Sequence, residues 1–122
     1  MAVYISVRGW VECDRKQLSA IKEIIEKDAG NRYYGGWGFP VRPFNWTSYA
    51  FYGGDIQEAD IPWLRGQLVE IANLPPLDED GSEVQGLFML THEIEGLTEW
   101  QIRNGGIQEL PGDERHGYLG PF

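Results

Sequence analysis

The chain has 122 residues, 42% of them hydrophobic, and a formal net charge of −9. This length suits one compact domain whose core forms without a metal or a disulfide. Cys13 is the only cysteine, which excludes an internal disulfide. An acidic chain repels the phosphate backbone that nucleic-acid-binding proteins attract with Lys and Arg, so the composition argues against a nucleic-acid partner.

The N-terminal segment MAVYISVRGW lacks the basic flank and long apolar run of a signal peptide. No window approaches the ~18 apolar residues that cross a bilayer. A chain without a disulfide also suits a reducing compartment. We therefore expect a soluble cytoplasmic protein without a membrane partner.

The charge is unevenly distributed along the chain. Residues 1–54 carry seven basic and five acidic side chains, whereas residues 55–122 carry three basic and fourteen acidic ones. A strongly negative surface attracts a basic partner and speeds their encounter. Acidity that only keeps the protein soluble is the common alternative, but the asymmetry favours a basic protein partner.

The first predicted element is a strand over AVYISVRGWVEC, because its side chains alternate in character. One face is apolar and holds Val3, Ile5, Val7 and Val11. The other face is polar and aromatic and holds Tyr4, Arg8, Trp10 and Glu12. This alternation predicts a strand with one face on the core.

A helix is predicted over DRKQLSAIKEIIEKDAGN. Asp14 can cap it, Gln17 completes a capping box, and Gly30 follows the last turn. Its apolar stripe consists of Leu18, Ile21, Ile24 and Ile25.

The segment YYGGWGFPVRPFNW (33–46) holds six of the sixteen aromatic residues. Its glycines and prolines predict a long loop or an irregular edge strand. Base stacking is disfavoured, because only Arg32 and Arg42 lie nearby. Carbohydrate stacking stays open, and Phe44 and Trp46 are expected to pack over the core.

A protein interface is the remaining reading of this segment, because Trp, Tyr and Arg dominate binding hot spots. The aromatic candidates for partner binding are Tyr34, Trp37 and Phe39. The acidic candidates, which would imitate substrate phosphates and steer the partner, are Asp55, Glu58, Asp60, Glu93 and Glu95.

The middle of the chain predicts a strand followed by a second helix. WTSYAFY (46–52) predicts a strand that stops at Gly53 and Gly54. Asp60 and Pro62 open a second helix. Its apolar stripe consists of Leu64, Leu68 and Ile71.

The last part of the chain predicts a turn and three strands. LDEDGSE (77–83) is the turn, and VQGLFMLTHEIE is apolar enough for a central strand. EWQIRNGGIQEL predicts a hairpin with Asn104 and Gly105 at its turn.

The element order predicts an α+β fold. We expect a two-layer α/β sandwich with both helices on one sheet face, ferredoxin-like with an extra C-terminal β-hairpin. Residues 1–122 form one domain in this prediction, with 113–122 as a candidate flexible tail.

The sequence predicts no cofactor, metal or catalytic residue. On a strand, Glu93 and Glu95 would project from one face and His92 from the other, so they would not converge on a metal. Cys13 lies near a helix N-terminus, where a thiol's pKa can fall, but no base lies near it in the sequence, so packing is favoured. His116 is read as a surface residue.

Four segments together resemble the small acidic immunity proteins encoded beside bacterial polymorphic toxins, including partners of contact-dependent growth-inhibition toxins. The segments are YISVRGWVEC, NWTSYAFYGGDI, LPPLDEDG and GLFMLTHEIEGLTEWQIRNG, and the likeness spans most of residues 3–110. It carries over no functional residue. The resemblance implies a non-enzymatic inhibitor that binds a cognate basic toxin, often a nuclease, and blocks its active site or substrate groove.

Two alternatives stay open. One is a small enzyme or ligand-binding domain, with a pocket beneath the aromatic loop 33–46 that holds His92 or Glu95. The other is a phage or accessory subunit that acts through homo-oligomerisation.

Overall fold

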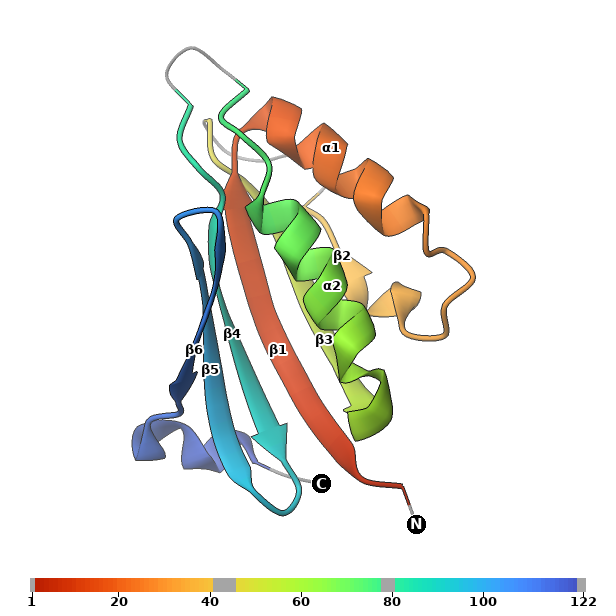
Figure 1. Ribbon diagram of the computed structural model, residues 1–122, viewed down its shortest axis with the longest axis vertical. Helices are drawn as coiled ribbons and strands as arrows, with labels where there is room; N and C mark the ends of the chain where they lie inside the picture. The colour runs from red at the N-terminus through yellow and green to blue at the C-terminus, as the bar shows by residue number, and fades with distance from the viewer. Residues whose placement is uncertain (1, 41–45, 78–80, 121–122) are drawn as a thin grey trace.

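The computed structural model describes residues 2–40, 46–77 and 81–120 (Figure 1). Its strands are β1 (Tyr4–Cys13), β2 (Trp37–Gly38), β3 (Ser48–Gln57), β4 (Gln85–His92), β5 (Gly96–Arg103) and β6 (Gly106–Pro111). Its α-helices are α1 (Arg15–Glu26) and α2 (Ile61–Ala72). Short 3-10 helices are η1 (Tyr34–Gly36), η2 (Glu58–Asp60) and η3 (Glu114–Leu119).

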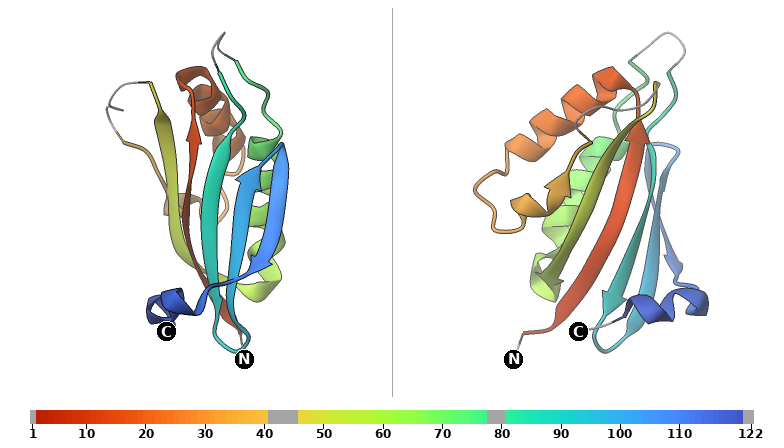
Figure 2. Two further views of the ribbon diagram at one scale, coloured as in Figure 1. Left: turned by 90° about the vertical axis from the view of Figure 1, so that its left-hand side faces the viewer. Right: turned by 180° about the vertical axis from the view of Figure 1, so that it is seen from behind.

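The strands form one six-stranded sheet in the order β2-β3-β1-β4-β5-β6, and every neighbouring pair is antiparallel. Both α-helices cover the same face of this sheet, and η3 lies at one end of the opposite face (Figures 1 and 2). The predicted α+β class and two-layer arrangement are therefore confirmed. None of the described helices is long and apolar enough to cross a membrane.

The central strand β1 follows its sequence pattern. Ile5, Val7 and Val11 are buried against the helices, as the alternation predicts. α1 begins with the predicted capping box, in which Asp14 accepts from the Gln17 N–H and the Gln17 side chain accepts from the Asp14 N–H. This cap fixes the direction in which the chain leaves β1.

The helix stripes also agree with the sequence. Leu18, Ile21, Ile25, Leu64, Leu68 and Ile71 are buried in the core between the helices and the sheet. Asp60 precedes α2 and Pro62 lies in its first turn, but the Asp60 side chain does not cap the helix.

The prediction that β3 ends at Gly53 is wrong. The strand continues to Gln57, with Gly53 opposite Arg8 and Gly54 opposite Val7 of β1. Pairing with the ten-residue β1 offers a continuous hydrogen-bond ladder, which outweighs the weak strand preference of two glycines.

The C-terminal part of the chain turns back onto the sheet. β5 and β6 pair across Asn104 and Gly105, whose φ angles are +53° and +76°, as a tight turn requires. Beyond β6, residues 114–119 form η3 instead of a flexible tail. The Leu119 carbonyl accepts hydrogen bonds from Arg8 at 2.7 Å and from Thr91 at 3.2 Å. In the predicted turn 77–83, residues 78–80 lie outside the described part of the chain.

Candidate functional site

Trp37 does not offer its ring to a partner, so this part of the site prediction is wrong. It lies opposite Tyr52 on the helix-covered face and is 9% exposed. Its Nε1–H donates to Gln67 Oε1 at 3.0 Å, and its ring meets that of Tyr52 edge-on at 5.1 Å. The glycines beside it let the chain fold over its own core.

Tyr34 and Phe39 are half-buried and are held by neighbouring charges. The Tyr34 hydroxyl donates to Glu26 at 2.6 Å, and this bond raises the pKa of Tyr34. The Lys22 ammonium lies 5.0 Å from the centre of the Phe39 ring. The described part of the aromatic segment is therefore mainly a packed edge of the fold.

Trp46 behaves in the opposite way to the prediction. It is 82% exposed, whereas the sequence suggested packing over the core. Phe44, which the same prediction named, and Arg42 lie outside the described residues.

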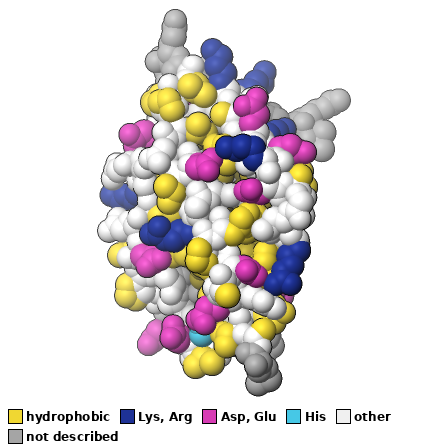
Figure 3. All heavy atoms as spheres, turned by 45° about the vertical axis from the view of Figure 1, so that its right-hand side comes forward, with side chains coloured by type: hydrophobic (Ala, Val, Ile, Leu, Met, Phe, Trp, Pro, Cys, Tyr) yellow, Lys and Arg dark blue, Asp and Glu magenta, His cyan; other side chains and the backbone are white. Residues whose placement is uncertain are grey.

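Four of the five predicted carboxylates lie exposed at one end of the sheet, and we call Asp55, Glu58, Glu93 and Glu95 the acidic end. They come together because β3 and β4 both end beside the start of β1. The Glu58 N–H donates to the Val3 carbonyl, and Glu93 accepts from the N–H of Tyr4 at 2.9 Å. In Figure 3, acidic side chains gather beside a histidine at the lower end of the molecule.

Asp60, the fifth predicted carboxylate, is engaged within the chain. It accepts hydrogen bonds from Arg32 and from the Tyr33 hydroxyl, both at 2.9 Å. The bond from Arg32, followed by that from Tyr33, lowers the pKa of Asp60. We therefore assign Asp60 to the junction between the aromatic segment and α2.

The prediction that His92 and Glu95 lie on opposite faces is wrong, because β4 ends at His92 and residues 93–95 form a turn. His92 Nε2 lies 2.6 Å from Glu58 Oε2. One ligand atom from each of Glu58, His92 and Glu95 lies within 4.8 Å of the others.

This cluster is poorly arranged for a metal. His92 Nδ1 accepts from the N–H groups of Ile94 at 3.1 Å and Glu95 at 3.0 Å. The ring proton therefore belongs on Nε2, where it is donated to Glu58. Metal binding through Nε2 would require a proton on Nδ1, facing two N–H donors.

A second exposed feature is the sheet face that the helices leave bare. We call Trp10, Tyr49, Phe51, Leu87 and Met89 the open sheet face; register and alternation place them together on β1, β3 and β4. Sequence reasoning identified only Trp10. The alternation in SYAFY and GLFML was available as a signal, but it does not tell which face the helices cover.

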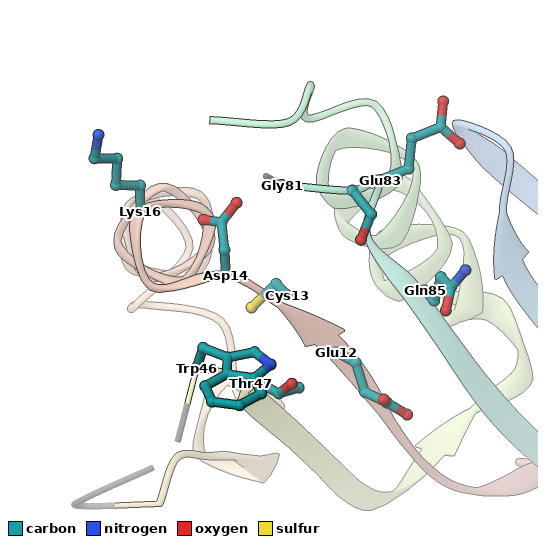
Figure 4. Close-up of a pocket in the computed structure, with 10 residues that line it drawn as sticks. Glu12, Cys13, Asp14, Lys16, Trp46, Thr47, Gly81, Glu83 and Gln85 are labelled. Atoms are coloured by element: carbon teal, nitrogen blue, oxygen red, sulfur yellow. The ribbon is translucent and has the colours of Figure 1, made fainter. Parts of the chain in front are cut away.

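A hollow of about 860 Å³ lies at the end of the sheet opposite the acidic end, where β1 leads into α1 (Figure 4). Its lining includes Glu12, Asp14, Trp46, Glu83 and Gln85. Neither His92 nor Glu95 lines it, so the expected enzyme-like pocket around those residues is not this hollow.

Cys13 also borders the hollow, and its thiol is buried. Burial, followed by the charge of Asp14, raises the pKa of Cys13 to about 12. This is opposite to the effect of a helix N-terminus and agrees with a packing role. Comparison of the chain with protein-family models, curated proteins and solved structures finds no match.

Proposed function

We propose that this chain is a non-enzymatic immunity protein, which neutralises a basic nuclease toxin by covering its active site or its substrate groove. The observation that carries this proposal is the acidic end. Glu58 is distant in sequence from Glu93 and Glu95, yet all three carboxylates are exposed at the same end of the sheet. A cluster of carboxylates is complementary in charge to a partner surface that binds the phosphates of a nucleic-acid substrate.

In the proposed mechanism, the carboxylates of the acidic end occupy the positions of substrate phosphates and steer the encounter. A chain with net charge −9 presents a long-range field that attracts a basic toxin. In this proposal the inhibitor acts in the cytoplasm, where a single reduced cysteine is expected.

We also propose a ferredoxin-like architecture with an added hairpin. The order β2-β3-β1-β4, with α1 after β1 and α2 after β3, supports this assignment. β5 and β6 then extend the sheet beside β4.

Co-expression tests the proposed function. Bacteria would produce the toxin region encoded by the reading frame beside this gene, with or without this chain. We expect growth and intact nucleic acid only when the chain is present, and a stoichiometric complex on purification. Degradation of nucleic acid despite full expression of the chain would contradict the proposal.

The charge dependence needs a matched pair of variants. Combined Glu58→Gln, Glu93→Gln and Glu95→Gln should weaken protection, because the substitutions remove charge at nearly constant volume. Glu23→Gln with Glu70→Gln, on exposed helix positions, is the control and should leave protection unchanged.

A further inference from the structure

We propose that the basic partner docks on the open sheet face and places an arginine or lysine side chain in the hollow beside Trp46. This inference rests on the proposed function. It identifies the surface whose apolar side chains would contact the partner. Trp37 cannot be this anchor, because its ring is buried.

The open sheet face provides a continuous row of apolar side chains. The register places Phe51 opposite Trp10, and Trp10 opposite Leu87, across three neighbouring strands. The Tyr49 and Phe51 rings stack at 5.9 Å with an interplanar angle of 13°. Phe51 is 46% exposed. Stacked, preordered rings lose little entropy on binding and are typical hot-spot residues.

In the described part of the chain, no helix covers this row. Both α-helices pack on the opposite face, and η3 contacts the other end of the sheet through Leu119 (Figure 2). The uncovered area therefore extends from the middle of β1 to the hollow.

The hollow supplies the chemistry for a cationic side chain. Glu12, Asp14 and Glu83 line it, and the exposed Trp46 ring forms another part of its wall (Figure 4). Lys16 also lines the hollow, and its side chain extends away from Asp14 in the same view. A cation against an indole face gains a cation–π contact, and carboxylates add charge-assisted hydrogen bonds.

Hydrogen bonds within the hollow leave acceptors for such a ligand. Glu12 Oε2 accepts from the Trp10 Nε1–H at 2.9 Å, which leaves the second carboxylate oxygen of Glu12 as an acceptor for a ligand. Asp14 Oδ2 is buried and has no hydrogen-bond partner in the described part of the chain. A buried carboxylate oxygen without a donor is costly, and a cation in the hollow would offset part of its negative charge without contacting it.

Charge decides between a basic partner and a second copy of this chain. Glu12 borders the apolar row, Glu83 lines the adjoining hollow, and Glu99 lies on the same face of β5. A symmetric dimer through this face would bring these carboxylates together, and like charges across an interface are unfavourable. A basic partner turns the same carboxylates into attractive contacts.

NMR with a defined probe locates the binding surface. The probe is a short peptide of alternating arginine and leucine, with a glutamate-and-leucine peptide as the charge control. We expect the indole N–H signals of Trp10 and Trp46 to shift with the basic peptide only. The signals of Trp37 and Trp100, which are buried, should stay in place.

Two matched variants separate this inference from the proposed function. Phe51→Ser should raise the peptide's dissociation constant about tenfold, as expected for a hot-spot ring. Ile94→Ser removes an even more exposed apolar side chain, at the acidic end, and should leave it nearly unchanged. Glu83→Gln should weaken binding more than Glu95→Gln.

Signal shifts confined to residues 93–95, no shift at Trp10 and Trp46, or equal losses in both serine variants would overturn the inference. None of these results would affect the co-expression test, which measures protection whatever surface the toxin contacts. If this chain neither binds nor inhibits the toxin, both the proposed function and this inference are wrong.

Discussion

The pKa of the Cys13 thiol is set by its surroundings in the fold. Burial raises its pKa from 9.0 to about 12, and the charge of Asp14 adds to the shift. The thiolate is the reactive form. We expect folded protein to react with iodoacetamide at pH 8.5 far more slowly than urea-unfolded protein, as measured by mass spectrometry.

The pH dependence of this group has a defined sign. Because the folded pKa is the higher one, the contribution of the thiol to stability is complete below the unfolded value of 9.0 and is lost as pH rises toward about 12. Equal reaction rates of Cys13 in folded and unfolded protein would contradict the packing role.

His92 allows a direct test of whether Glu58, His92 and Glu95 bind a metal. Its Nδ1 accepts two N–H groups, so we expect an equimolar addition of zinc to leave the melting temperature unchanged. Thermal unfolding with and without zinc measures this. A rise with zinc that His92→Ala abolishes would favour the metal-site alternative instead.

Among the elements, β1 and β4 approach one another closely at Gly9. A Cβ on Gly9 would lie 2.4 Å from the Leu87 carbonyl oxygen and 2.6 Å from the Phe88 ring. We expect Gly9→Ala to destabilise the fold by about 1–3 kcal/mol through overpacking, measured by urea unfolding.

Gly53→Ala is the matched control, because a Cβ there meets nothing within 4 Å. It should leave stability unchanged or raise it slightly, since alanine restricts the unfolded chain. Equal destabilisation by both substitutions would show that the tight approach of β1 and β4 is not the cause.

Elements whose signals are local could be predicted from the sequence. The Asp14–Gln17 capping box needs only two residues, and the alternation of β1 needs only its own side chains. The extension of β3 through Gly53 could not be predicted, because it depends on pairing with a distant strand. The strand preferences of residues 46–54 carry no information about pairing with β1.

The candidate site, too, could be predicted only where its signals are local in the sequence. Its acidic side chains could be named from composition, but their gathering depends on where β3 and β4 end. Burial of Trp37 depends on Gln67 and Tyr52, which lie far along the chain. The rings on β3 and the side chains of β4 were missed because the exposed face is decided by where the helices pack.

On the scale of the whole molecule, the proposed function depends on the negative charge of the surface. The chain has a net charge of −9, and its described surface carries acidic groups both at the acidic end and around the hollow. The open sheet face lies between them and provides apolar contact area. A basic protein that spans this surface would meet carboxylates at both ends.

The rate at which this chain associates with the proposed basic toxin, measured by stopped flow over increasing salt, tests that claim most directly. The screening length falls from about 10 Å at 0.1 M salt to about 3 Å at 1 M. We predict that the association rate constant falls by about tenfold or more over this range. A rate constant independent of salt would contradict the account.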